Sequence, residues 1–204
     1  MKIGILKETQ IGERRVSMSP NIAKQLISKG FEILVEEEAG ANSSYKNDDY
    51  KNAGVHVEKR GVVYKEATIL LKINPFDDED LKLVDKGHVL ISQLYHKSNP
   101  ELIARIAAKG ASAFSLDAIP RISRAQDMDV LSSQNNLAGY KAVILGAYEM
   151  TKIFPLMMTA AGTITPSRVL IYGVGVAGLQ AIATAKRLGA VFEGAEICSG
   201  TKEK

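Results

Sequence analysis

Short apolar runs alternate along this chain with segments of helical composition. The apolar runs predict strands at residues 2–7, 31–35, 55–58, 69–72, 89–92, 111–115, 169–172 and 190–195. Helices are expected between them, at residues 22–29, 48–53, 99–109 and 179–188. Continuous apolar strands that alternate with helices are typical of a parallel sheet covered on both faces. The pattern predicts an α/β fold that begins with a mainly parallel, flavodoxin- or Rossmann-like domain.

This rhythm breaks in the polar segment 117–129, which is rich in arginine and aspartate. The segment after it, up to Phe154, has helical composition and is too long for a crossover helix. We therefore expect a long helix that links two domains and ends at Pro155. The predicted division is an N-terminal α/β domain at 1–129, a linking helix at 130–158, and the incomplete start of a Rossmann dinucleotide-binding domain at 159–204.

The composition is that of an ordinary globular protein, with 46% hydrophobic and 24% charged residues among 204. The net charge of +3 is spread along the chain, so a nucleic-acid partner is not expected. Cys198 is the only cysteine, which excludes an internal disulfide and fits a reducing compartment. No run approaches the roughly 20 apolar residues that cross a bilayer. The three histidines have no metal-ligand spacing, so no metal site is expected.

A glycine-rich segment, GVGVAG at residues 173–178, lies between a predicted strand and a predicted helix. This is the context that a dinucleotide-binding fingerprint requires. Gly173 would allow a tight turn, Gly175 the approach of the backbone to a pyrophosphate, and Gly178 the close packing of helix on strand. Val176 would begin the helix, whose first N–H groups and positive dipole end favour phosphates.

Glu196 follows the next predicted strand, at the spacing expected of the carboxylate that binds an adenosine ribose. A carboxylate there also repels a 2′-phosphate, which favours NAD(H) over NADP(H). The alternative is a glycine-rich turn that binds nothing. The flanking strand and helix, together with the acid, favour the NAD(H) interpretation.

Other motifs point to one family. The chain carries PRISRAQ at 120–126, MDVLSSQ at 128–134 and NLAGY at 136–140, and it also has IGILKE at 3–8, ERRV at 13–16 and GVAGL at 175–179. Together these motifs closely resemble the NAD(H)-binding subunit (alpha, domain I) of proton-translocating NAD(P) transhydrogenase. The match spans the whole chain. The related alanine dehydrogenases share the fold and the fingerprint but not the loop at 120–126.

The resemblance implies that NAD(H) binds here, that a separate subunit or domain binds NADP(H), and that a membrane domain couples hydride transfer to proton movement. It also implies a homodimer, and a soluble part that is peripheral on the cytoplasmic or matrix face of an energy-coupling membrane. The chain stops eight residues after Glu196. We therefore expect an N-terminal piece of a longer protein that binds NADH weakly, if at all, and is inactive alone.

The resemblance also assigns residues. Arg121, Gln126 and Asp129 are the expected catalytic residues, because they would border the nicotinamide together with Ser132, and Gln126 would reach toward the second nucleotide. Their donors and acceptors suit a carboxamide and ribose hydroxyls. No proton acceptor is needed, since hydride passes directly between two nicotinamides and the protein positions them. On residue types alone, the loop could instead be an interdomain linker with internally paired charges.

Two positions depart from the family pattern. Glu196 stands where the family usually has Asp, which keeps the acceptor and moves it by about one methylene, so the preference for NAD should survive. Cys198 stands where the family usually has Arg, which removes a cation that could lie near the adenosine. We interpret Cys198 as an ordinary late-strand residue, because no activating base is near it in the sequence.

Two alternatives remain open. An amino-acid oxidoreductase similar to alanine dehydrogenase would use an arginine for the substrate carboxylate, and a lysine and a histidine for acid–base chemistry. Arg15 and Lys72 occupy matching places, but Tyr95 occupies the histidine position and His96 comes one residue late. The other alternative is a non-catalytic, truncated nucleotide-binding fragment.

Overall fold

The computed structural model describes residues 1–196. Two compact units make up the chain, Met1–Met128 and Asp129–Lys204. Cys198 lies outside the described residues. The division into three domains stays a prediction.

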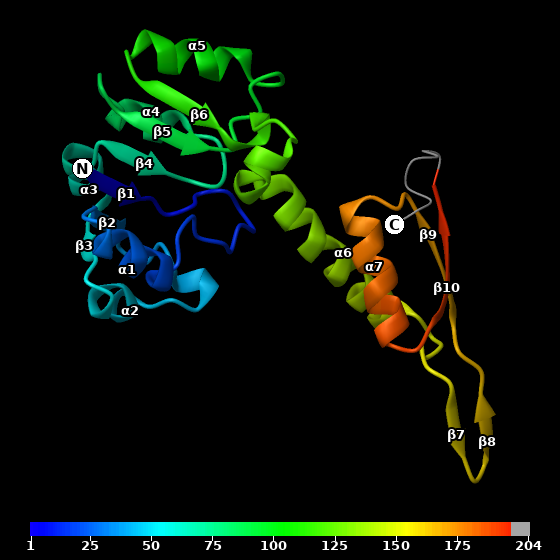
Figure 1. Cartoon of the computed structure of the whole chain (residues 1–204). Helices are drawn as coiled ribbons and strands as arrows, with labels where there is room; N and C mark the ends of the chain where they lie inside the picture. The colour runs from blue at the N-terminus through cyan, green and yellow to red at the C-terminus, as the bar shows by residue number, and fades with distance from the viewer. Residues whose placement is uncertain (197–204) are drawn as a thin grey trace. The chain divides into compact units, whose positions relative to one another are not determined.

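The first unit is built on a six-stranded parallel sheet (Figure 1). Its strands run in the order β3-β2-β1-β4-β5-β6, so the strand order reverses between β1 and β4. In doubly wound sheets, ligands bind at the carboxyl ends of the strands at such a switch point. The parallel α/β fold expected from the sequence is confirmed. The strands are β1 (Lys2–Ile5), β2 (Glu32–Glu36), β3 (His56–Glu58), β4 (Ile69–Leu71), β5 (Val89–Ser92) and β6 (Ser112–Ser115).

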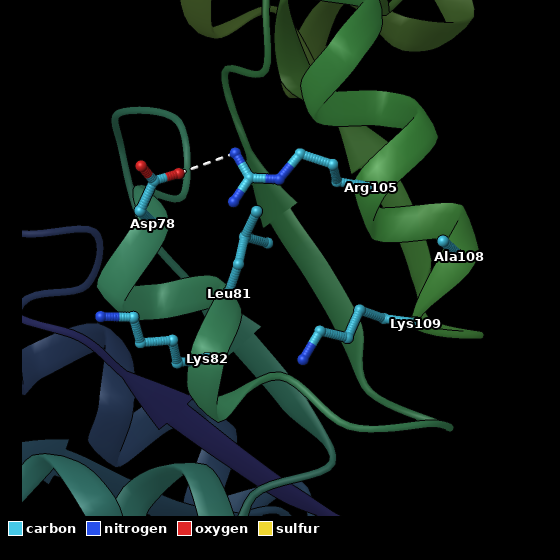
Figure 2. Close-up of a pocket in the computed structure, with 6 residues that line it drawn as sticks. All are labelled: Asp78, Leu81, Lys82, Arg105, Ala108 and Lys109. Atoms are coloured by element: carbon cyan, nitrogen blue, oxygen red, sulfur yellow. Dashed lines mark hydrogen bonds and ion pairs between the residues drawn. The ribbon is translucent and has the colours of Figure 1, made fainter.

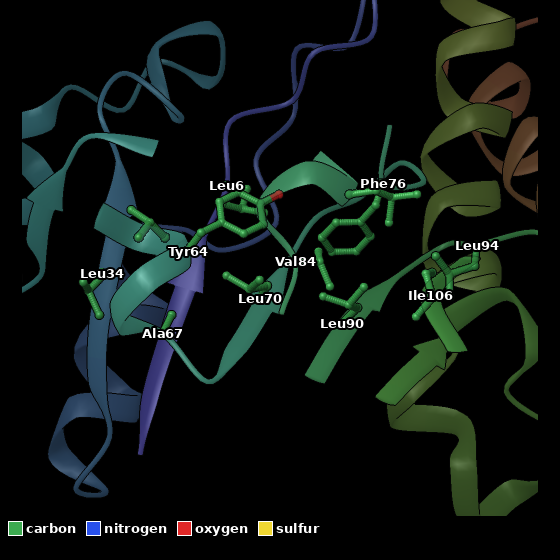
Figure 3. Close-up of a cluster of buried hydrophobic side chains, with 12 residues drawn as sticks. Leu6, Leu34, Tyr64, Ala67, Leu70, Phe76, Val84, Leu90, Leu94 and Ile106 are labelled. Atoms are coloured by element: carbon green, nitrogen blue, oxygen red, sulfur yellow. The ribbon is translucent and has the colours of Figure 1, made fainter. Parts of the chain in front are cut away.

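Helices cover the two faces of this sheet. On one face, α3, α4 and α5 pack on a cluster that includes Leu34, Leu70 and Leu90 (Figure 3). On the other face, α1 and α2 pack on a cluster that includes Ile5 and Val35. The alternation of side chains along each strand sends neighbouring residues to opposite faces. The helices are α1 (Pro20–Ser28), α2 (Asn47–Asn52), α3 (Arg60–Glu66), α4 (Asp78–Leu83) and α5 (Pro100–Ala108), and three 3-10 turns are η1 (Ala41–Ser43), η2 (Leu116–Ala118) and η3 (Ser123–Met128).

The second unit pairs a long helix with a strand–helix–strand element (Figure 1). Strands β9 and β10 are parallel, and α7 connects them and packs against α6. A separate antiparallel hairpin, β7–β8, precedes β9. The core of the unit consists of Val143, Phe154, Ala181, Ala185 and Ala190. The elements are α6 (Val130–Glu149), β7 (Met157–Thr159), β8 (Gly162–Ile164), β9 (Arg168–Tyr172), α7 (Val176–Arg187) and β10 (Val191–Ala195).

The end of the long helix differs from the expectation. Helix α6 ends at Glu149, and the backbone of Met150 is extended. The reason is tertiary: Phe154 enters the core of the unit, and its carbonyl accepts the Ser167 N–H at 3.1 Å. These contacts require residues 150–154 to leave the helix before Pro155 is reached.

Two short helices and one hairpin were not expected from the sequence. Helices α3 and α4 are only 7 and 6 residues long, too short for a helical period to stand out. The hairpin β7–β8 has strands of three residues, and every residue in them is exposed. An exposed hairpin shows no alternation between buried and solvent-facing positions, so its sequence lacks the usual signal.

Candidate nucleotide-binding site

The glycine-rich loop makes the tight turn that its sequence predicts. Gly173 follows β9 with φ +84°, a left-handed conformation that favours glycine, and its N–H donates to the Ala195 carbonyl at 2.8 Å. A Cβ on Gly178 would lie 1.9 Å from the Gly173 carbonyl oxygen. Helix α7 can therefore approach the end of β9 only because both positions are glycine.

Open space lies over the middle glycine of the loop, Gly175. A Cβ on Gly175 would meet no atom of the described residues within 4 Å. Gly175 is also the N-cap of α7, and among residues 1–196 no side chain caps the N–H groups of the first turn, which begins at Val176. Uncapped N–H groups at a helix start form a ready site for an anion. This part of the loop fits a pyrophosphate by its chemistry.

Glu196 lies against this loop. Its Oε2 accepts the Val174 N–H at 2.6 Å. The parallel pairing of β10 with β9 explains the contact, since it places the carboxyl ends of both strands side by side. The structure thus brings together Gly173, Gly178 and the carboxylate expected to bind the ribose.

Gly139 is a residue whose role the sequence did not reveal. A Cβ at this position of α6 would lie 2.1 Å from the carbonyl oxygen of Ala177, in the first turn of α7. The glycine therefore lets the two helices touch beside the glycine-rich loop. A glycine in the middle of a helix costs about 1 kcal/mol relative to alanine, and that cost is the one signal that could have suggested a packing role.

Asp129 and Ser132 meet at the start of α6. The Asp129 carboxylate is the N-cap: it accepts the Ser132 N–H at 2.9 Å and the Ser132 hydroxyl at 2.6 Å. This N-cap stabilises the helix by about 1 kcal/mol. The two predicted nicotinamide contacts are thus partners of one another, and Asp129 has a structural role as well.

Arg121 and Gln126 lie in the first unit, on the loop that ends in η3. Both side chains are exposed, and Ala125 is the one buried residue of η3. Hydrogen bonds from Ile122 N–H to the Pro120 carbonyl and from Ala125 N–H to the Ile122 carbonyl shape the loop. The predicted site residues therefore form separate groups, and their convergence on one nucleotide stays a prediction.

At the switch point of the first unit, Arg15 is engaged by a carboxylate of the same chain. Glu13 accepts the Arg15 side-chain N–H groups at 2.8 and 2.7 Å and the Asn74 amide at 3.0 Å. The hydrogen bonds from Arg15 lower the pKa of Glu13 to about 2. The guanidinium that an amino-acid oxidoreductase would use for its substrate already holds a carboxylate.

Lys72 is also engaged. Its ammonium group lies 2.5 Å from the Asp80 carboxylate, and both side chains are at most 1% exposed. Asp80 also accepts from the Tyr64 hydroxyl at 2.6 Å and from Arg60. Burial raises the pKa of Tyr64, so its hydroxyl stays a donor. This buried network links α3, the end of β4 and α4, and it already occupies the Lys72 ammonium group.

A shallow cavity of about 540 Å³ lies between α4 and α5 (Figure 2). Its lining includes Leu81 and the ion pair between Arg105 and Asp78, whose side chains are 2.7 Å apart. None of the predicted site residues lines it.

Within residues 1–196, no helix combines the length and the apolar character that a membrane span requires.

Comparison with known proteins places these features in a family. The family described as "Alanine dehydrogenase/PNT" matches through its N-terminal domain at residues 4–138 and through its C-terminal domain at residues 142–204. A Rhodospirillum rubrum protein, named as the first of the parts that form "NAD(P) transhydrogenase subunit alpha", is 46% identical over the whole chain, which covers 55% of that protein. The "Alanine dehydrogenase" of Bacillus subtilis is 30% identical over 93% of the chain and 50% of its own length.

A solved structure agrees with these matches. The transhydrogenase from Sinorhizobium meliloti is 42% identical and has a TM-score of 0.96, over the whole of this chain and 58% of that one. The chain spans about half the length of the curated relatives named above. The resemblance seen in the sequence motifs is confirmed, and the chain belongs to the alanine dehydrogenase/PNT family.

Proposed function

We propose that this chain is the NAD(H)-binding part of a proton-translocating transhydrogenase, which passes hydride between NADH and NADP⁺. The observation that carries the proposal is the loop at 173–178, where uncapped helix N–H groups, the open space over Gly175 and the Glu196 carboxylate occur together. Relatives up to 46% identical are named as alpha subunits of NAD(P) transhydrogenase, which supports the same interpretation.

The loop would bind the two ends of the adenosine diphosphate moiety differently. N–H groups at the start of α7, from Val176 onward, would donate to the pyrophosphate. The Glu196 carboxylate would accept from a ribose hydroxyl and would repel a 2′-phosphate. Since Glu196 is already held by the Val174 N–H, its charge is fixed beside the loop. The chain would thus select NAD(H), and NADP(H) would bind to a separate subunit or domain.

The ring end would be held by residues near the start of α6. Ser132 lies seven residues before Gly139 in that helix, a rise of about 10 Å from the contact with α7. An extended dinucleotide whose phosphates lie at α7 can span such a distance. Asp129 and Ser132 would contact the nicotinamide riboside, and Arg121 and Gln126 would complete the contacts from the preceding loop.

NAD(H) supplies the hydride chemistry when bound. The chain would orient the ring and exclude water, and no side chain needs to take a proton. Gln126 would align the ring with the second nucleotide, and the exposed position of its side chain is compatible with that role.

An amino-acid oxidoreductase is the second candidate, because alanine dehydrogenases are among the relatives at 26–30% identity. The ion pairs of Arg15 with Glu13 and of Lys72 with Asp80 argue against it. Oxidation of NADH by pyruvate and ammonia, with no hydride transfer to an NADP⁺ analogue, would establish this second candidate instead.

The partners would be the NADP(H)-binding and membrane subunits or domains of the same enzyme, with this part peripheral to the membrane. A homodimer is also proposed. The side chains of Met157, Met158 and Ile164 on β7–β8 are 46–74% exposed, and such apolar exposure supports contact with a second copy.

The test is kinetic, on the full-length protein assembled with its partners. Replacing Gln126 with Asn should reduce the rate of hydride transfer about tenfold while the NADH dissociation constant changes less than twofold. Stopped-flow kinetics and calorimetry measure the two quantities. Replacing Gln25, an exposed residue of α1, with Asn is the matched control and should change neither. An equal loss of rate and affinity at Gln126 would mean that this residue only binds.

A further inference from the structure

Strand β9 has a paired edge and an open edge (Figure 1). Among residues 1–196 it pairs with β10 alone, and the Val191 N–H of β10 donates to the Ser167 carbonyl at 2.9 Å. The N–H and C=O groups of successive residues in a strand point alternately to its two sides. Since Ser167 faces β10, the backbone groups of Arg168, Leu170 and Tyr172 point to the open edge.

The outer edges of three other strands offer fewer backbone groups. Strands β3 and β6 are the edges of the six-stranded sheet, and β10 has an outer edge of its own. By the same alternation, the outward residues are Val57 in β3, Ala113 and Ser115 in β6, and Phe192 and Gly194 in β10. None of these edges offers as many outward N–H and C=O groups as β9.

The side chains along the open edge of β9 are accessible. Leu170 is 52% exposed and Tyr172 is 80% exposed. Arg168 forms an exposed ion pair with Glu193 of β10, with 2.5 Å between their side chains, so its charge is partly neutralised within the chain. An exposed strand edge with apolar side chains and without proline is a template for pairing with another chain.

This edge is complementary to a second copy of itself. When two β9 strands pair antiparallel about a two-fold axis at Leu170, the two leucines face each other and Arg168 of each copy faces Tyr172 of the other. Facing Cβ atoms lie about 5 Å apart, which lets the guanidinium reach the tyrosine ring for a cation–π contact. Each facing pair would also exchange two backbone hydrogen bonds. An in-register parallel arrangement would instead place like charges opposite each other at Arg168, which is unfavourable.

We infer that two copies of this chain associate through the open edge of β9, in a continuous sheet with the order β10-β9-β9-β10. The two-fold arrangement uses each open edge once, so the assembly closes at the dimer. The inference rests on the proposed function in one respect, since it names a surface for the homodimer proposed above. The exposed hairpin β7–β8 is the competing surface.

Sedimentation velocity of the 204-residue chain over a series of concentrations tests this dimer. Leu170→Lys places two ammonium groups opposite each other at the axis and should raise the dissociation constant of the dimer about tenfold or more. Met158→Lys, on the hairpin at 74% exposure, is the matched control and should change the constant less than about twofold. A chain that is monomeric at every concentration, or a dimer lost in Met158→Lys and kept in Leu170→Lys, would overturn the inference.

Substitutions at Tyr172 test the antiparallel register. Tyr172→Glu would face Arg168 of the second copy with an opposite charge, so the dissociation constant should stay within about threefold of wild type. Tyr172→Lys would face it with a like charge and should raise the constant about tenfold or more. Equal weakening by both substitutions would contradict the facing of Arg168 and Tyr172.

Amide hydrogen exchange, followed by NMR, reports on the backbone of the same edge. In the dimer the outward N–H groups of Leu170 and Tyr172 should exchange about tenfold more slowly or less at high protein concentration. The N–H groups of Val169 and Ile171 face β10 and should respond much less to concentration. Fast exchange of the outward groups at every concentration would mean that the edge stays open. Slow exchange at every concentration would mean that a segment of the same chain covers it. Either result would overturn the inference.

Titrations with NADH keep the dimer and the proposed function apart. If the full-length enzyme binds no NADH but the substitutions at Leu170 and Tyr172 change the dimer as expected, the pairing of β9 stands and the proposed function fails. If NADH binds and the chain is monomeric, or dimerises through the hairpin, the proposed nucleotide site stands and the pairing of β9 is wrong.

Discussion

In each of the two units, a ligand could bind at the carboxyl ends of the strands. The polar groups at these two places differ in their partners. At the switch point of the first unit, Arg15 and Lys72 are bound to Glu13 and Asp80 of the same chain. At the glycine-rich loop of the second unit, none of the described side chains caps the start of α7 or fills the space over Gly175. The two cations at the first place are thus already bound within the chain, whereas the helix N–H groups at the second place lack a side-chain partner among residues 1–196.

The largest loss of stability is expected at the contact between α6 and α7 in the second unit. Replacing Gly139 with Ala places a methyl group 2.1 Å from the Ala177 carbonyl oxygen. Because the obstacle is backbone, the helices must separate, and the free energy of unfolding should fall by about 2–4 kcal/mol. Urea denaturation measures it.

Gly146, on the same helix, is the matched control. Its Cβ would meet nothing within 4 Å, so replacing Gly146 with Ala should stabilise the protein by about 0.5–1 kcal/mol. Equal effects at both glycines would show that helix propensity, and not the contact with α7, governs the result.

A substitution at Gly175 should affect the binding of NADH more than the stability of the fold. Replacing Gly175 with Val fills the space proposed for the pyrophosphate and should weaken NADH binding at least tenfold, about 1.4 kcal/mol or more. Calorimetry on the full-length protein measures the affinity. The unfolding free energy should fall by only about 0.5–1 kcal/mol, from the loss of glycine at the N-cap of α7, since a Cβ there would meet no described atom within 4 Å. Unchanged affinity would count against the phosphate site.

The ion pair between Glu13 and Arg15 in the first unit should make the free energy of unfolding depend on pH. The hydrogen bonds from Arg15 lower the pKa of Glu13 from 4.5 to about 2, so its contribution to stability is complete above pH 4.5 and disappears as the pH falls toward 2. Replacing Glu13 with Gln should cost about 1 kcal/mol at pH 7, since solvent screens the half-exposed Arg15, and almost nothing near pH 2.

Urea denaturation at several pH values provides the measurement, and replacement of the exposed Glu37 with Gln provides the comparison. A cost for Glu13→Gln that is the same at pH 7 and pH 2 would mean that the ion pair does not stabilise the fold.

Features that depend on residues close together in the chain could be predicted from the sequence. The turn at Gly173 needs a left-handed residue and the approach of α7 needs Gly178, so both requirements are visible in a short segment. The position of Glu196 beside the loop could be predicted because parallel strands end at the same edge of a sheet, and the acid has the expected spacing from the first glycine.

Features that depend on contacts between residues far apart in the chain could not be predicted from the sequence. Gly139 must be glycine only because Ala177 packs against it. Arg15 and Lys72 resembled substrate-binding cations because nothing in the local sequence assigns Glu13 and Asp80 to them. Helix α6 stops at Glu149 because Phe154 is needed in a core that forms only after the chain returns at Ser167.

The contact between Gly139 and Ala177 also has a mechanical meaning. Where a helix touches the backbone of its neighbour without intervening side chains, there is no soft layer to absorb a displacement. A displacement of the first turn of α7 is therefore transmitted to α6, whose own first turn is capped by Asp129. In the proposed site, a displacement at the phosphate end of the nucleotide would also reach its ring end through the protein.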